Sequence, residues 1–253
     1  MKGRIPGEAA PRFEARILPG PDALAEAAAE EVRSAAQEAI ESRGVFRIAL
    51  SGGSTPRRLY ARLTERPFRG GIRWSRTLFF FGDERCVPPV SDRSNFRTAK
   101  EGLFDPLKVP SERVFRMRGE DDPRSAAAGY ARVLAEHVEE ERRLPRFDMI
   151  LLGLGPDGHT ASLFPGTRAV SEREKTAAAN WVPRWKEWRL TLTLPVLNAS
   201  RRVLFLVAGP DKAAPATAIL RRERGYRDLP AAAVRPKYGS LLWLLDEEAG
   251  ARL

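Results

Sequence analysis

The chain has 253 residues, of which 43% are hydrophobic and 30% charged, and its formal net charge at pH 7 is +10. A chain of this length and composition can bury a core, and its single cysteine excludes an intrachain disulfide. No apolar stretch approaches the roughly 20 residues that span a bilayer, and residues 1–8 lack the apolar core of a signal peptide. We therefore expect a cytoplasmic protein with no membrane partner.

The first elements alternate between helix and strand. Residues 23–42, which are rich in Ala, Glu and Arg, predict a helix that ends at Gly44. The apolar run 45–50 predicts a buried strand. A second helix follows after a glycine-rich turn, with Thr55 as its N-cap and Pro56 in its first helical position.

The same alternation continues to the end of the chain. Strand followed by helix, repeated, predicts an α/β fold with a largely parallel sheet, and no segment marks a domain boundary. Further strands are expected at 77–81, 149–152, 189–194, 202–208 and 241–245, and further helices at 94–104, 125–143 and 213–221.

The turn at residues 51–55 reads Ser-Gly-Gly-Ser-Thr and joins a strand to a helix. Glycines let backbone N–H groups approach an anion, and a helix start adds unpaired donors and a partial positive charge. The turn matches neither the Walker motif nor the GxGxxG spacing of dinucleotide-binding folds, and a plain strand–helix turn stays the alternative. Its candidate phosphate-binding residues are Gly52, Gly53, Ser54 and Thr55.

Three charged residues, Asp83, Glu84 and Arg85, directly follow the predicted strand 77–81. If the sheet is parallel, they face the same crevice as the turns that follow the other strands. Arg85 can hold a phosphate or a carboxylate through two hydrogen bonds. The alternative is a solvated loop, which is common for charged triplets.

His159 is one of two histidines, and it follows strand 149–152 after a glycine-rich turn, with Asp157 two residues before it. Open α/β sheets bind ligands at the carboxyl ends of their strands, and imidazole is readily poised for proton transfer near neutral pH. A loop histidine that caps the following helix is the alternative. The glycines and the adjacent carboxylate favour a catalytic pair. The other histidine, His137, is expected on the surface of helix 125–143.

Lys212 stands at the start of helix 213–221, behind a Gly-Pro turn and a predicted Asp211 cap. A cation in the first turn of a helix is disfavoured by roughly 0.3–1 kcal/mol, and a bound anion would compensate. The alternative is that Lys212 points into water. For metal ions the sequence offers too few ligands, since two distant histidines and one cysteine make no recognisable site.

Four segments together resemble the 6-phosphogluconolactonase family, in order from about residue 45 to 215. The segment that contains Asp157 and His159 is the most specific of them. The resemblance implies one Rossmann-like α/β domain over residues 1–253, with helices on both faces of a largely parallel sheet. The four segments are 51–56, 82–85 with Ser94-Asn95, 153–166, and 189–193 leading to 209–212, and residues 241–246 resemble the family's ending.

The resemblance also implies an activity: hydrolysis of 6-phosphoglucono-δ-lactone to 6-phosphogluconate in the oxidative pentose phosphate pathway, without metal or organic cofactor. The substrate is then a small anionic sugar phosphate. His159 would take a proton from water, a role worth roughly 10²–10⁴ in rate, and Asp157 would orient it. Backbone N–H groups of the 157–160 turn are candidates for the carbonyl oxygen. Candidates for the phosphate and the sugar, with their division open, are Lys212, Arg85, Asp83, Arg189 and the backbone of 52–55.

Other functions stay open at this point. The glucosamine-6-phosphate deaminases and isomerases have a similar glycine turn and Asp-Gly-His, but Phe164 replaces the acidic residue of their pattern, and Glu84-Arg85 stands where they usually have Glu-Tyr. Nucleic-acid binding is a second alternative because the chain is basic. However, its basic runs are only pairs and carry no aromatic platform for bases, so no nucleic acid is expected. A sugar-phosphate sensor without turnover is a third alternative. We expect a monomer.

Overall fold

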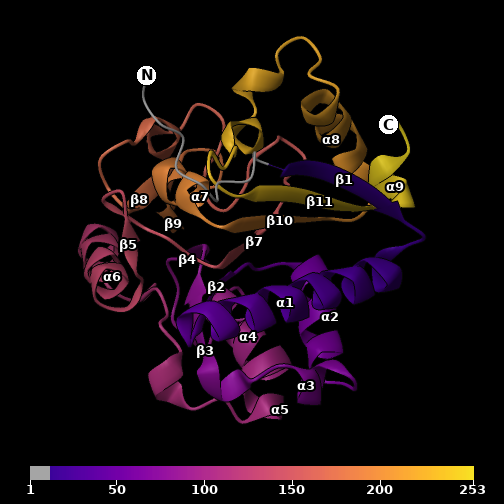
Figure 1. Cartoon of the computed structure of the whole chain (residues 1–253). Coiled ribbons are helices and arrows are strands. Elements are labelled where there is room, and N and C mark those ends of the chain that lie inside the picture. Colours follow the sequence, from indigo (N-terminus) through magenta and orange to yellow (C-terminus); the bar gives the residue numbers. More distant parts are fainter. Residues whose placement is uncertain (1–11) are drawn as a thin grey trace, which may run out of the picture.

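A six-stranded parallel sheet forms the centre of the structure, a computed structural model that describes residues 12–253. Its strand order is β1-β11-β10-β7-β2-β3 (Figure 1). Five of these strands lie where apolar runs predict them, whereas β1 has no counterpart among the predicted strands. The strands are β1 Arg12–Leu18, β2 Phe46–Leu50, β3 Thr77–Phe81, β7 Met149–Gly153, β10 Arg202–Val207 and β11 Ser240–Asp246.

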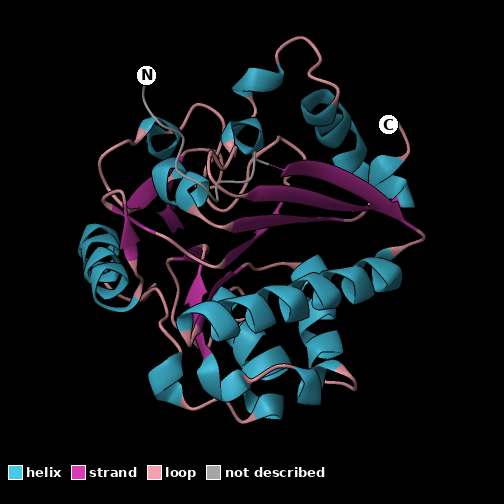
Figure 2. Ribbon diagram, in the orientation of Figure 1, coloured by secondary structure: helices cyan, strands magenta, loops and turns pink. Residues whose placement is uncertain are grey.

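Helices cover both faces of this sheet, which explains why strands such as β7 and β10 are apolar on both sides. Helices α1 and α2 lie along one face and α7 and α8 along the other (Figures 1 and 2). The predicted α/β class and the parallel sheet between helices are confirmed. The helices are α1 Pro21–Arg43, α2 Ser54–Leu63, α3 Phe68–Gly71, α4 Asn95–Ala99, α5 Asp105–Leu107, α6 Pro123–His137, α7 Leu194–Ala199, α8 Ala213–Leu220 and α9 Glu247–Gly250.

A second, antiparallel sheet with the order β4-β9-β8 stands beside the main one. The predicted strand 189–194 belongs to this sheet and ends at Leu192, because α7 begins at Leu194. Its alternating apolar and polar residues predict one covered face, but residues 189–192 are buried on both faces of the strand. The strands of this sheet are β4 Asp83–Arg85, β8 Ala177–Val182 and β9 Glu187–Leu192.

The predicted helix 125–143 extends six residues too far, because α6 ends at His137, and α6 begins two residues earlier than expected, at Pro123. Three glutamates follow, and acidic side chains are unfavourable at the negative end of a helix. The chain instead forms a small hairpin of β5 (Glu140–Glu141) and β6 (Leu144–Pro145). His137 is only partly exposed, since its ring lies 4.2 Å from that of Phe115 between centroids.

Two expectations concern membranes and export. Within residues 12–253, no helix is long and apolar enough to cross a bilayer. Residues 1–8, which are expected not to form a signal peptide, lie outside the described residues.

Candidate functional site

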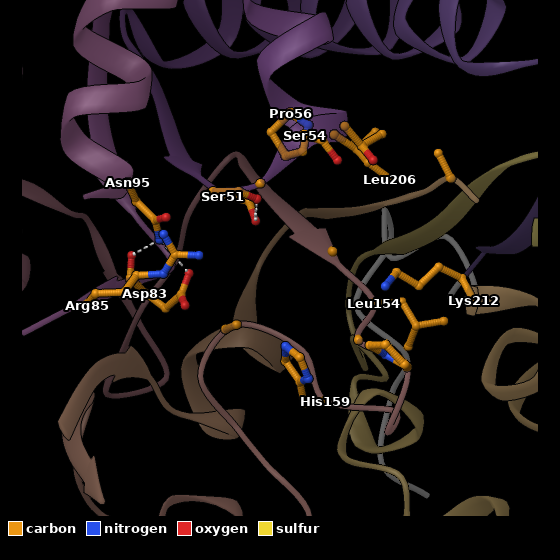
Figure 3. Close-up of a pocket in the computed structure, with 18 residues that line it drawn as sticks. Ser51, Ser54, Pro56, Asp83, Arg85, Asn95, Leu154, His159, Leu206 and Lys212 are labelled. Carbon is orange, nitrogen blue, oxygen red and sulfur yellow. Dashed lines mark hydrogen bonds between the residues drawn. The ribbon is translucent and has the colours of Figure 1, made fainter. Parts of the chain in front are cut away.

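A cavity of about 240 Å³ opens at the carboxyl ends of β2, β3, β7 and β10. The loop after each of these four parallel strands contributes to its wall, as expected for an open α/β sheet. Figure 3 shows Lys212 and Arg85 entering from opposite sides, with His159 between them. The predicted residues that line this cavity are Gly52, Gly53, Ser54, Thr55, Asp83, Arg85, His159 and Lys212.

His159 and Asp157 form a hydrogen-bonded pair at this cavity. The Nδ1 atom of His159 lies 2.5 Å from Oδ1 of Asp157, and the backbone N–H of His159 donates to the same oxygen over 3.2 Å. Burial alone would raise the pKa of Asp157, but the hydrogen bonds and the charge of His159 outweigh burial and lower this pKa. Asp157 itself does not line the cavity and contacts the imidazole instead.

Gly155 lets the imidazole lie directly against the backbone. A Cβ at this position would come within 1.9 Å of the His159 Nδ1 atom, so no side chain fits there. Two backbone N–H groups of the turn already have hydrogen-bond partners within it. Gly158 N–H donates to the carbonyl of Gly155, and His159 N–H donates to the carboxylate of Asp157. These two N–H groups are therefore committed within the turn, which leaves the N–H groups of Asp157 and Thr160 as the candidates for a carbonyl oxygen.

The glycine turn leads into α2 two residues earlier than expected. The N-cap is Gly53, with φ 105°, and the helix begins at Ser54, so Thr55 lies in the first turn and is not the cap. Such a positive φ favours glycine over every residue with a Cβ. The backbone N–H groups of Ser54 and Thr55 belong to the helix start, where intrahelical partners are absent, and they can bind an anion.

The three charged residues of β4 separate onto two faces, because side chains alternate along a strand. Asp83 and Arg85 line the cavity, whereas Glu84 is 2% exposed and points into the protein. Glu84 accepts hydrogen bonds from three backbone N–H groups and from the Ser94 hydroxyl. Burial raises the pKa of Glu84, although these donors offset part of that effect. The expectation that all three residues face one crevice is correct for two of them.

Asn95 and Ser162 are polar residues that the candidate set lacks, and both hold Asp83. The side-chain amide of Asn95 donates to Oδ1 of Asp83 over 3.1 Å, and the hydroxyl of Ser162 donates to Oδ2 over 2.7 Å. Asn95 also lines the cavity, and its Oδ1 atom has no hydrogen-bond partner. Both residues lie within the segments that carry the family resemblance, which is the signal that points to them.

Lys212 ends a 3₁₀ turn, Pro210–Lys212, and its ammonium lies 2.6 Å from the carboxylate of Asp211. Asp211 makes no cap hydrogen bond, so the predicted cap is wrong. Arg189 does not line the cavity. Its guanidinium pairs with Glu187 and lies 5.1 Å from the ring centroid of Trp185.

The described part of the chain contains no cluster of three or more His, Cys, Asp or Glu residues arranged to hold a metal ion. A parallel sheet with an imidazole, an ammonium group and a helix N-terminus at its carboxyl edge defines an α/β protein with a site for a small anion. The chain belongs to the family of glucosamine-6-phosphate isomerases and 6-phosphogluconolactonases, whose model matches residues 19–243.

Individual relatives cover nearly the whole chain. It is 38% identical to the 6-phosphogluconolactonase of Streptomyces coelicolor, over 91% of this chain and 90% of that protein. It is 37% identical to that of Mycobacterium tuberculosis, over 94% and 97%. The structure of 6-phosphogluconolactonase from Trypanosoma brucei is similar with a TM-score of 0.85 and 28% identity, over 97% of this chain and all of that one. A monomeric glucosamine-6-phosphate deaminase shares the fold, with a TM-score of 0.80 and 19% identity.

Proposed function

We propose that the protein hydrolyses 6-phospho-D-glucono-1,5-lactone to 6-phospho-D-gluconate, a step of the oxidative pentose phosphate pathway. The observation that carries this proposal is the His159–Asp157 pair in a cavity with cations at both ends. Hydrolysis of a phosphorylated sugar lactone needs a base that deprotonates water, cationic groups that bind the phosphate, and hydrogen-bond acceptors for the sugar hydroxyl groups. The relatives named 6-phosphogluconolactonase, which match over most of their length, support the same activity.

The pair suits general-base catalysis on an ester. When Nδ1–H of neutral His159 donates to Asp157, the lone pair of Nε2 remains free to accept a proton from water. The hydroxide oxygen then bonds to C1 of the lactone, and the carbonyl oxygen becomes an oxyanion. As that oxyanion collapses, the C1–ring oxygen bond breaks, and the imidazolium returns its proton to the ring oxygen. Asp157 stabilises the imidazolium between these two proton transfers.

The other cavity residues bind the substrate in this proposal. Lys212 and the N–H groups at the start of α2 hold the phosphate, because both supply positive charge with free donors. Asp83 accepts from sugar hydroxyl groups, and its two hydrogen bonds to Asn95 and Ser162 fix its orientation. Arg85 neutralises the carboxylate end of the product.

The deaminase alternative meets an obstacle at Phe164. The ring of this residue lies 4.2 Å from that of His159 between centroids, at the position where the deaminase pattern has an acidic residue. A phenyl ring cannot take or give a proton. At position 164 the chain therefore lacks the acidic group that the deaminase pattern provides for acid–base chemistry on a sugar amine.

The test is a direct assay of acid release from freshly made 6-phosphogluconolactone, with glucosamine-6-phosphate as the control substrate. His159→Ala should lower kcat by about 100-fold or more while the protein stays folded, since a general base is worth roughly that factor. The matched control is His137→Gln, which alters the only other histidine and should keep wild-type activity. Near-wild-type kcat in His159→Ala removes the proposed base. Binding of 6-phosphogluconate without any turnover would instead support a sensor.

A further inference from the structure

Trp185 occupies the turn between β8 and β9, next to the proposed catalytic pair. Two backbone hydrogen bonds fix this turn, from Trp185 N–H to the carbonyl of Val182 and from Lys186 N–H to that of Pro183, both over 3.2 Å. Trp185 is 41% exposed and does not belong to the buried core. A large apolar side chain in this position contributes little to the core, so its contacts with neighbouring residues need another explanation.

The indole ring of Trp185 packs against two other rings, those of Phe164 and His159. It meets Phe164 edge to face, with 4.8 Å between ring centroids and an interplanar angle of 85°. It meets His159 in the same way, with 6.3 Å and 86°. Phe164 in turn lies against His159, so the three rings form a continuous aromatic cluster.

The same turn also reaches the carboxylate of the pair. A guanidinium nitrogen of Arg184 lies 3.9 Å from Oδ2 of Asp157, the oxygen that does not bond His159. The guanidinium of Arg189 lies over the indole ring of Trp185, 5.1 Å from its centroid. The hairpin thus contacts His159 through Trp185 and approaches Asp157 through Arg184.

We propose that Trp185 is a positioning residue for His159. Trp185, edge to face, and Phe164, tilted by 36°, restrict rotation of the imidazole, while the Asp157 carboxylate fixes its Nδ1 edge and the Gly155 backbone supports it. Nε2 is thereby held in one direction toward the cavity. This inference rests on the proposed function, in which Nε2 of His159 takes the proton from water.

The first test compares two tryptophans of the same hairpin. Trp181 is 42% exposed and packs against Trp188 at an interplanar angle of 59°, with no ring contact to His159 or Phe164. Trp185→Ala should lower kcat about 10-fold with KM changed less than about two-fold, because misplacement of a catalytic group affects the chemical step. Trp181→Ala should keep both constants at the wild-type level. Trp185→Phe, which retains an aromatic edge, should recover most of the lost rate.

The second test observes the imidazole itself. Because the chain has only two histidines, the imidazole N–H signals in ¹⁵N–¹H spectra are assigned by His159→Ala and His137→Gln. The Nδ1–H proton of His159, bonded to Asp157, should give a signal in the wild type and in Trp181→Ala. In Trp185→Ala this signal should broaden through faster exchange with water, while that of His137 stays unchanged.

The outcomes separate the inference from the proposed function. Wild-type kcat and an unaltered Nδ1–H signal in Trp185→Ala overturn the positioning role, as does an equal loss in Trp181→Ala. If His159→Ala stays active, the proposed base fails whatever Trp185 does, and a wild type that releases no acid from the lactone overturns the proposed function. Should Trp185→Ala fold poorly, Trp185→Phe and Trp185→Leu supply the comparison, because Leu fills space without an aromatic edge and should show the loss that Phe avoids.

Discussion

At the scale of single residues, the charge of Asp157 matters as much as its position. Asp157→Asn keeps the size of the side chain but removes the charge that stabilises an imidazolium. Its amide group can also donate to Nδ1, which would place the remaining proton on Nε2, where the base needs a lone pair. We expect kcat to fall by about 100- to 10,000-fold, with a smaller change in KM. Steady-state kinetics of the variant check this, and a loss confined to KM would contradict it.

The lowered pKa of Asp157 predicts how this variant affects stability. A carboxylate with a lower pKa in the folded state stabilises the fold above the unfolded value of 3.8, and this contribution disappears as pH falls through the folded pKa. The free energies of unfolding of the wild type and Asp157→Asn should therefore differ near neutral pH and converge below pH 3.8. Urea titrations at a series of pH values measure the difference, and a constant difference would argue against the ionised pair.

Lys212 should discriminate between phosphorylated and plain substrates. Loss of a charge-assisted hydrogen bond costs about 1.5–3 kcal/mol, so Lys212→Ala should raise KM for the phosphorylated lactone about 10- to 100-fold. KM for unphosphorylated gluconolactone should barely change. Lys100→Ala is the control, because Lys100 also pairs with an aspartate but lies away from the cavity. Equal effects on both lactones would mean that Lys212 does not bind the phosphate.

At the scale of elements, the turn before α2 depends on its two glycines for different reasons. A Cβ on Gly52 would lie 1.7 Å from Oδ1 of Asn95, a buried side chain that holds Asp83. A Cβ on Gly53 would meet no atom closer than 3.9 Å, but the φ of 105° at this position is unfavourable for residues other than glycine. Gly52→Ala should thus act by collision and Gly53→Ala by backbone strain.

A double-mutant cycle tests this difference. Each alanine variant should lose about 1–3 kcal/mol of unfolding free energy. Adding Asn95→Ala removes the colliding atom, so the cost of Gly52→Ala should shrink in that background while the cost of Gly53→Ala stays. Chemical denaturation of the wild type, the three single variants and the two double variants provides the numbers. An equal cost of Gly52→Ala in both backgrounds would show that Asn95 does not cause the strain.

The main strands and most helices follow from local patterns, because apolar runs and helix boundaries depend on a few neighbouring residues. The candidate site was predictable to the same extent, since loops after parallel strands meet at one edge. Arg189 could not be placed, because its neighbours depend on the pairing of β9 with β4, which lies far away in the sequence. The inward orientation of Glu84 depends on the same pairing. For β1, the sequence carries charges at alternate positions, and only pairing with the last strand identifies it.

At the scale of the whole molecule, that last pairing connects the two ends of the described chain. β1 runs parallel to β11 over seven residue pairs, from Arg12 beside Ser240 to Leu18 beside Asp246. The first strand thus lies at the C-terminal side of the sheet, while β2 and β3 lie at the opposite edge. A division of the sheet between β7 and β10 would separate β1 from β2 and β3, the strands that follow it in the sequence, and leave it with β10 and β11.

We propose on this basis that the chain is a single domain that unfolds as one unit. Loss of either half would leave β1 or β11 without its partner, so partly folded states should be poorly populated. Urea transitions followed by far-UV circular dichroism and by tryptophan fluorescence should coincide, and the tryptophans report widely, from Trp74 beside β3 to Trp243 within β11. The calorimetric and van't Hoff enthalpies should agree as well. Two separated midpoints would instead divide the chain into independent units, and the shared sheet could not then be the source of its stability.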